Sequence, residues 1–518
     1  MKILHWFRTH KSNHLNSFTV TVIILIVISV LLKSFFFVEH STFMNDDHSY
    51  YNMAKHLIKS QIISVDGVQN HTIFPPGYPI LISIQSLFSD SFRDIKFFQF
   101  VFIGTFFSVI SSIAGYRAFG NKYIFVMIFL HPAFILSAST LGVSSESWYS
   151  VFIWSGLILC FSYIKNNKTI FLLYANLFFC FSYLIRPEAL AFFGSSFAAF
   201  IYNYQSVQEL PKNHSIKSLI MWLLGGVRYL VGNKTILIFV TPVVLFVLPY
   251  ILYLYNNTGY ISISGKSLYN ARIVQELYAS STDHIFTNFI GILRNFIAPY
   301  FINPVITVGV IMFIYLAIKG KIKLTIFHVI LFTPFIIVIL SLLNYLPWAR
   351  ALYVFVPMFM FISLQALEYY LDGFGNFLKY LVFICINIIF IVIIYSAIYR
   401  GVLCNNPVMY DKIVDKIVEL EYGLNNEILV LTRNPKIDMN NKFINSCTFK
   451  SENLCAKLPD YIIVSNSEHI SLGGQTEIEK NVIDLKSFLY NKMTYESVAF
   501  IERCNDNKIN LFKLVKSE

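Results

Sequence analysis

Long apolar runs alternate with short polar segments over the first 400 residues of this chain. A helix needs about 20 apolar residues to cross a bilayer, and most of these runs reach that length. The first run, 18–38, follows Lys2, Arg8 and Lys11 and has no small-residue cleavage site before Glu39, which predicts a retained membrane anchor. Further spans are expected at 95–115, 122–140, 147–164, 169–185, 189–204, 235–255, 303–318, 324–345, 351–367 and 376–398. The pattern therefore predicts about eleven transmembrane helices.

Basic residues gather in alternate connections between these runs. They are Arg117 and Lys122, then Lys165 and Lys168, then Lys212, Lys217, Arg228 and Lys234, and finally Lys319, Lys321 and Lys323. Since cytoplasmic loops carry the excess of Lys and Arg, the N-terminus is predicted to be cytoplasmic, and an odd number of spans puts the C-terminus outside. We expect a multi-pass protein of the cell membrane whose remaining loops face outward.

Composition agrees with this class. Hydrophobic residues make up 56% of the 518 residues and charged residues 13%, and the mean hydropathy is +0.60, which excludes an ordinary soluble domain. The net charge of +11 lies mainly in the short loops, so it is assigned to topology, and a nucleic-acid partner is not expected. The chain has no Gly-rich phosphate loop between a strand and a helix, which argues against a nucleotide-driven transporter or a nucleotide-sugar enzyme.

The composition becomes mixed and polar from about residue 400. Short apolar runs at 428–432 and 461–465 and a closing pair at 497–501 and 510–514 are typical of strands. The predicted fold class is thus a multi-span α-helical membrane domain, 1–399, followed by a small extracytoplasmic α/β domain, 400–518. Cys404, Cys447, Cys455 and Cys504 lie in the latter, where one or two disulfides are expected with the pairing left open.

The first outer loop, 39–94, carries the most unusual polar residues. Asp46 and Asp47 stand at the N-terminus of a stretch, 47–59, whose apolar residues recur at three and four, which predicts an amphipathic helix on the membrane surface. One Asp at this position suits a helix cap, and the second is free for another role. A rigid turn, Phe74-Pro75-Pro76-Gly77-Tyr78-Pro79, follows and leads into an apolar helix over 80–88.

These motifs together resemble the GT-C superfamily of integral membrane glycosyltransferases. The first span is followed by Asp-Asp-x-x-x-Tyr-x-x-Ala and then by Pro-Pro-Gly-Tyr-Pro, as in the bacterial aminoarabinose transferases that act on lipid A and in the protein O-mannosyltransferases. Later segments fit the same pattern: Ser144-Ser145-Glu146-Ser147, Leu184-Ile185-Arg186-Pro187-Glu188 and Ala349-Arg350-Ala351-Leu352-Tyr353. The resemblance implies a polyprenyl-phosphate sugar as donor and transfer on the outer face of the membrane.

The resemblance also implies roles for residues of the first loop. Asp47, four residues before Tyr51, takes the place of the family's acidic residue and is expected to be the general base, with Asp46 as the alternative. Tyr51, Pro76, Gly77 and Tyr78 are expected to shape the substrate cavity. An inverting displacement at the anomeric carbon requires such a base and a cation near the leaving phosphate.

Few cations face outward in the predicted topology, so the phosphate ligands can be narrowed down. Arg350 matches the arginine position of the family, and Arg186 and Lys266 are the further candidates; Arg272 and Arg294 share the loop of Lys266. An arginine at a span end also serves as an interfacial anchor, and this alternative stays open. Glu146 and Glu188 are expected either to pair with these arginines or to hold sugar hydroxyls or a metal.

No cofactor is firmly implied by the sequence. A divalent metal near His48, Asp46 and Asp47 is a weak alternative, because the spacing matches no compact set of ligands. Two other functions stay open: a surface-polysaccharide polymerase or ligase, and a non-enzymatic flippase for a lipid-linked sugar, although the expected internal repeat of a transporter is lacking. The donor sugar and the acceptor, whether lipid, polysaccharide or protein, are left open, and lipopolysaccharide and other cell-envelope glycans are the products the resemblance suggests.

Overall fold

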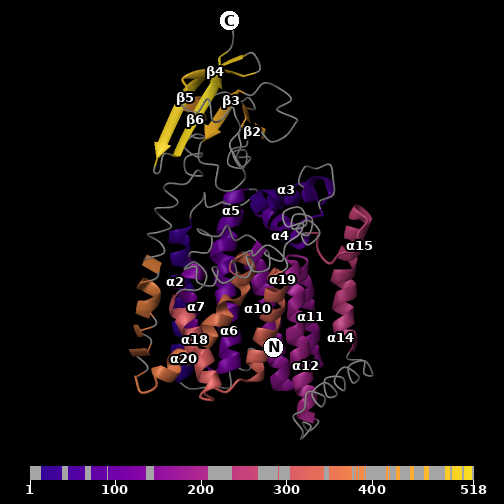
Figure 1. Cartoon of the computed structure of the whole chain (residues 1–518), viewed down its shortest axis with the longest axis vertical. Helices are drawn as coiled ribbons and strands as arrows, with labels where there is room; N and C mark the ends of the chain where they lie inside the picture. The colour runs from indigo at the N-terminus through magenta and orange to yellow at the C-terminus, as the bar shows by residue number, and fades with distance from the viewer. Residues whose placement is uncertain are drawn as a thin grey trace. The chain divides into compact units, whose positions relative to one another are not determined.

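The structure is a computed structural model that separates into two compact units. It describes residues 13–37, 45–64, 72–89, 91–135, 145–207, 236–265, 290, 304–343, 349–375, 378–379, 381–382, 384–389, 391–392, 416–417, 419–420, 428–431, 444–447, 460–465, 485–490, 493–503 and 507–515. Unit 1 comprises Met1–Phe37 and Ser49–Ile394, and unit 2 comprises Val38–His48 and Tyr395–Glu518. Unit 1 is helical and unit 2 contains the strands (Figure 1).

Unit 1 is a bundle of apolar helices. Its longer helices are α2 (Asn13–Phe36), α6 (Gly104–Phe119), α10 (Ser145–Asn166), α11 (Thr169–Tyr183), α12 (Phe193–Val207), α15 (Leu248–Thr258), α18 (Pro304–Ile318), α19 (Ile326–Leu343) and α20 (Val356–Tyr370). Five helical segments in the described part are long and apolar enough to cross a membrane: Phe18–Phe36, Arg93–Phe119, Ser145–Asn166, Ile236–Thr258 and Leu352–Tyr370. The chain is thus a multi-span membrane protein, and the total of eleven spans stays a prediction.

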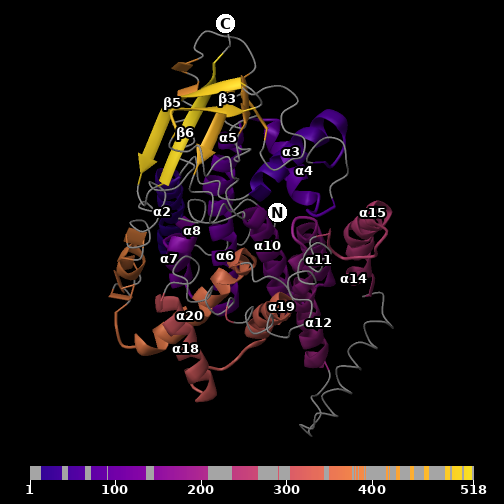
Figure 2. The same ribbon diagram turned by 45° about the horizontal axis from the view of Figure 1, so that its top comes forward.

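Helix α10 lies in the interior of the bundle, against α6, α11 and α12 (Figures 1 and 2). Trp154 at its middle is 1% exposed and donates from Nε1 to the carbonyl oxygen of Val354 at 2.9 Å. Gly156 lets the Phe179 ring approach, because a Cβ at this position would collide with that ring. Large aromatic side chains therefore fill this core, and a small residue permits the close contact of α10 with α11.

Several spans are interrupted where their sequence disturbs the helix ladder. The segment from α5 (Phe92–Phe97) to α6 passes through a π-helical turn, η1 (Phe98–Ile103), and a second one, η3 (Val243–Val247), follows Pro242 at the end of α14 (Ile236–Pro242). The span expected at 122–140 is not one continuous helix: α7 (Tyr123–Phe129) ends before Pro132, and α8 (Pro132–Ile135) begins at that residue. Proline lacks the N–H that would continue the ladder, which explains the break.

A buried lysine lies between α2 and α6. Lys33 is 0% exposed, and its Nζ donates to the hydroxyl oxygens of Thr105 and Ser108, each at 3.4 Å. These two hydroxyls are the partners of Lys33 within the described residues. An ammonium group placed among apolar helices with only neutral acceptors is costly.

Two short helices, α3 (Asn45–Ser60) and α4 (Gly77–Ser86), lie across one end of the bundle, beyond the ends of α10 and α11 (Figures 1 and 2). The predicted amphipathic helix at 47–59 corresponds to α3. The predicted helix at 80–88 begins earlier, at Gly77, because Pro76 already has helical backbone angles. Short 3-10 helices, η2 (Pro187–Phe192) and η4 (Ala349–Phe355), precede α12 and α20.

Unit 2 contains a six-stranded mixed sheet in the order β2-β1-β3-β6-β5-β4. The strands are β1 (Ile428–Leu431), β2 (Ile444–Cys447), β3 (Tyr461–Ser465), β4 (Ser487–Tyr490), β5 (Met493–Arg503) and β6 (Asn507–Leu514). β1 pairs in parallel with β2 and β3, whereas the remaining pairs are antiparallel. The expected closing pair is part of β5 and β6. The side chains of the four cysteines for which disulfides are expected lie outside the described structure.

Candidate functional site

Segments far apart in the sequence meet at the end of the bundle where α10 begins and α11 ends. Gly77 donates its backbone N–H to the carbonyl oxygen of Leu184 at 2.7 Å. A Cβ at Gly77 would lie 2.6 Å from that oxygen, so only glycine permits this contact. The Tyr183 hydroxyl donates to the carbonyl oxygen of Ile263 at 2.5 Å. The charge pattern of the loops predicts the same side of the membrane for all these segments. We call this the loop end of the bundle.

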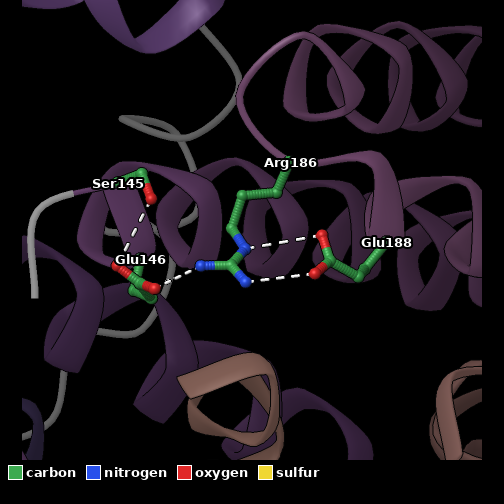
Figure 3. A network of polar contacts seen from close by, with 4 residues as sticks. All are labelled: Ser145, Glu146, Arg186 and Glu188. Carbon is green, nitrogen blue, oxygen red and sulfur yellow. Dashed lines mark hydrogen bonds and ion pairs between the residues drawn. The ribbon is translucent and has the colours of Figure 1, made fainter. Parts of the chain in front are cut away.

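The most prominent polar feature at the loop end is a network of Glu146, Arg186 and Glu188 (Figure 3). Arg186 follows α11, Glu146 lies in the first turn of α10 and Glu188 in η2. Arg186 donates from Nη1 to Glu146 Oε1, from Nη2 to Glu188 Oε1 at 3.0 Å and from Nε to Glu188 Oε2 at 3.4 Å. The hydroxyl of Ser145 donates to the second oxygen of Glu146 at 3.3 Å. One guanidinium thus joins two acidic residues that are 42 positions apart in the chain.

The network is largely shielded from solvent. The exposed fractions of the side chains are 1% for Glu146, 10% for Arg186 and 23% for Glu188, so the network reaches the surface at Glu188. Burial alone would lower the pKa of Arg186, but Glu188 and Glu146 outweigh it and hold this pKa well above its usual value. Arg186 therefore stays charged at every accessible pH, and its positive charge is matched by carboxylates on both sides.

An aromatic ring lies beside the guanidinium. The ring centroid of Tyr149 is 5.9 Å from Arg186 Cζ. Tyr50 of α3 packs against Phe74 and Tyr78, with 4.8 Å between ring centroids in each case. Packed rings thus connect α3 with the proline-glycine turn.

Tyr78 is fixed by a chain of hydrogen bonds. Its hydroxyl donates to Gln99 Oε1 at 2.5 Å, and Gln99 Nε2 donates to Gln85 Oε1 at 2.8 Å. Gln99 lies in the π-helical turn η1, which places its side chain within reach of Tyr78. The turn at Pro76 and Gly77 is therefore held at both ends, through Leu184 and through Gln99.

The structure brings together some of the predicted site residues. Glu146, Arg186 and Glu188 are in contact, so the expected pairing of the glutamates with an arginine is present. Gly77 contacts Leu184, two residues before Arg186 in the chain. Tyr51 has a different neighbour: it is 5% exposed, and Lys55 Nζ lies 4.4 Å from its ring centroid.

Other predicted residues are described only by their backbone or not at all. Asp46 and Asp47 lie in the first turn of α3 and Arg350 lies in η4, but their side chains are outside the described structure, as is Lys266 entirely. Within the described residues no group of three or more His, Cys, Asp and Glu side chains is arranged to hold a metal ion. The roles of Asp47, Asp46, Arg350 and Lys266 therefore stay predictions.

Sequence reasoning missed Tyr50 and Tyr149. Tyr149 stands three residues after Glu146, which is one helical turn, and this spacing would have placed it on the same face of α10. Tyr50 stands beside the predicted Tyr51, among the apolar residues of the amphipathic helix 47–59. In the structure it is Tyr50 that packs on Tyr78.

The chain is remotely similar to solved structures. No family model matches the chain, and no curated protein matches it. Among solved structures, the chain is similar to the Archaeoglobus fulgidus oligosaccharyltransferase tethered to an acceptor peptide with the NVT sequon, with a TM-score of 0.43 and 14% sequence identity. The similarity covers 82% of this chain and 63% of the archaeal enzyme, so the chain matches less than two thirds of that protein.

Proposed function

We propose that this protein is a GT-C-like glycosyltransferase that moves a sugar from a polyprenyl phosphate to a lipid, polysaccharide or protein acceptor at the extracytoplasmic face of the cell membrane. The observation that supports it best is the buried Glu146–Arg186–Glu188 network held against the Pro76–Tyr78 turn. Buried charges in a membrane protein are retained mainly where they serve a function, and the loops that carry them are the ones that resemble the superfamily.

In this proposal Asp47 is the general base. It would remove the proton of the acceptor hydroxyl as that oxygen attacks the anomeric carbon and the sugar–phosphate bond breaks, and Asp46 is the alternative base. Asp47 lies one helical turn before Tyr50 and Tyr51 on α3, so the helix that carries the base also carries the ring that packs on Tyr78.

The leaving phosphate requires a cation, for which Arg350 and Lys266 are proposed. Arg186 was a third candidate, but three of its N–H groups already point to carboxylates. A guanidinium whose charge is matched on two sides attracts a phosphate only weakly, so Arg186 is assigned the positioning of Glu146 and Glu188 instead.

The test is transfer in membranes that contain the wild type, Asp47→Asn or Asp46→Asn, supplied with a panel of polyprenyl-phosphate sugars and followed by mass spectrometry. Loss of the general base is expected to slow transfer by about 10²–10⁴-fold. Asp372→Asn is the matched control, because Asp372 is an exposed acid in the turn after α20. Full activity of both Asn variants would exclude this active site, and a wild type that consumes no donor of the panel would exclude the function.

A further inference from the structure

Tyr149 has a buried hydroxyl without a hydrogen-bond partner in the described part of the protein. The residue is 2% exposed, and its ring lies against the guanidinium of Arg186. Among the residues that the structure describes, its hydroxyl oxygen contacts no hydrogen-bond donor or acceptor. A buried hydroxyl without a partner in the chain is unfavourable, so a bound water or a ligand is expected to satisfy it.

Two of the other tyrosine hydroxyls at the loop end have hydrogen-bond partners. Tyr78 donates to Gln99 Oε1 and Tyr183 donates to the carbonyl oxygen of Ile263. Close to Tyr149, by contrast, the same lack of a partner among the described residues recurs at Trp148 Nε1, Ser150 Oγ and Ser182 Oγ. These atoms belong to the first two turns of α10 and the last turn of α11, the two helix ends that Arg186 and Glu146 join. These three atoms thus belong to the same two helix ends as the network.

The neighbours of Tyr149 define what kind of ligand suits this place. Glu146 and Glu188 carry negative charge and repel phosphate, but carboxylate oxygens accept hydrogen bonds from hydroxyl groups. Tyrosine rings offer an apolar face together with a group that both donates and accepts. This combination fits a neutral ring with several hydroxyls, and Glu188 gives the network its access to the surface.

We propose that Tyr149 is a substrate-contacting residue whose hydroxyl binds a hydroxyl group of the transferred sugar, next to the Arg186 network. This inference rests on the proposed function and deepens it, because it separates a sugar subsite at α10 from the phosphate site proposed at Arg350 and Lys266.

The experiment compares Tyr149→Phe with the wild type in purified full-length protein. Undecaprenyl-phosphate mannose and undecaprenyl-phosphate glucose serve as probes, and undecaprenyl phosphate without a sugar is the third ligand. Loss of one hydrogen bond is expected to raise KM and Kd for the sugar-bearing lipids about 3- to 10-fold, with binding of the sugar-free lipid unchanged. The unfolding midpoint of Tyr149→Phe is expected to equal or exceed that of the wild type, because the unpaired hydroxyl is removed.

Two control variants separate binding from stability. Tyr183→Phe removes a hydroxyl that has a partner and should lower the unfolding midpoint. Ser363→Ala removes another buried hydroxyl that has no partner among the described residues, in α20, and should leave KM and Kd unchanged.

The failures are distinguishable. Transfer by the wild type with equal KM and Kd in Tyr149→Phe overturns the sugar subsite alone, and so does an equal loss of binding for the sugar-free lipid. A wild type that transfers no sugar overturns the proposed function. The binding measurements then decide the sugar subsite. It is overturned if the wild type binds neither sugar-bearing lipid, or if Tyr149→Phe binds them as tightly as the wild type.

Discussion

Replacing Arg186 by methionine is the sharpest test of the network at the loop end. Methionine keeps much of the length of the side chain and removes the charge with which Glu146 forms its ion pair. The side chain of Glu146 is 1% exposed, so hydration cannot replace the lost interaction with Arg186. Glu188, at 23% exposed, recovers part of its hydration.

The magnitude follows from this difference in burial. Breaking a buried ion pair by removing one partner costs about 3–5 kcal/mol, most of it from the uncompensated charge that remains. Glu146→Gln leaves no bare charge, and Arg186 retains both hydrogen bonds to Glu188, so its cost is expected to be about 1–2 kcal/mol. The double variant Arg186→Met/Glu146→Gln removes the charge that made the first change costly and should be more stable than Arg186→Met alone.

The assay is unfolding of the full chain in mixed micelles by titration with SDS, with all variants measured in the same lipid. The expected order of stability is wild type, Glu146→Gln, the double variant and Arg186→Met. Asp372→Asn, which neutralises an exposed acid in the turn after α20, serves as the control with no expected change. If Arg186→Met unfolds like the wild type, or if the two single changes simply add, the three side chains do not form one coupled network.

Two further changes test the packing around the site and in the bundle. Gly77→Ala should lower the free energy of unfolding by about 1–3 kcal/mol and reduce transfer, because the new Cβ would collide with the backbone carbonyl of Leu184. The control Gly375→Ala should change neither quantity, because nothing lies within 4 Å of the added Cβ. Equal unfolding midpoints of Gly77→Ala and the wild type would refute the close contact. Lys33→Met should raise stability by about 1–3 kcal/mol, since it removes a buried ammonium that has only two hydroxyl partners in the described structure; a clear loss of stability would show that the charge is compensated.

The local pattern was sufficient for many of the elements. Apolar length predicted the five long apolar helical segments of the described part of the chain. The spacing at three and four predicted α3 within two residues at its start and one at its end. Short apolar runs predicted β1, β3 and the pair of β5 and β6, but not β2 and β4. The break at Pro132 was visible in the sequence and was outweighed by the hydropathy of the run.

For the candidate site, too, the sequence predicted the local features and the tertiary structure decided the contacts. The sequence by itself determined that Glu146, Arg186 and Glu188 lie at the ends of apolar runs, because the hydropathy that decides this is local, and the loop charges predict one side of the membrane for all three. Only the tertiary structure decided that Arg186 binds both glutamates, that Gly77 rests on Leu184 and that the ring of Tyr149 lies beside the guanidinium. These contacts depend on which helices pack together and how each is rotated about its axis, and that choice is made by side chains distant in sequence filling one core.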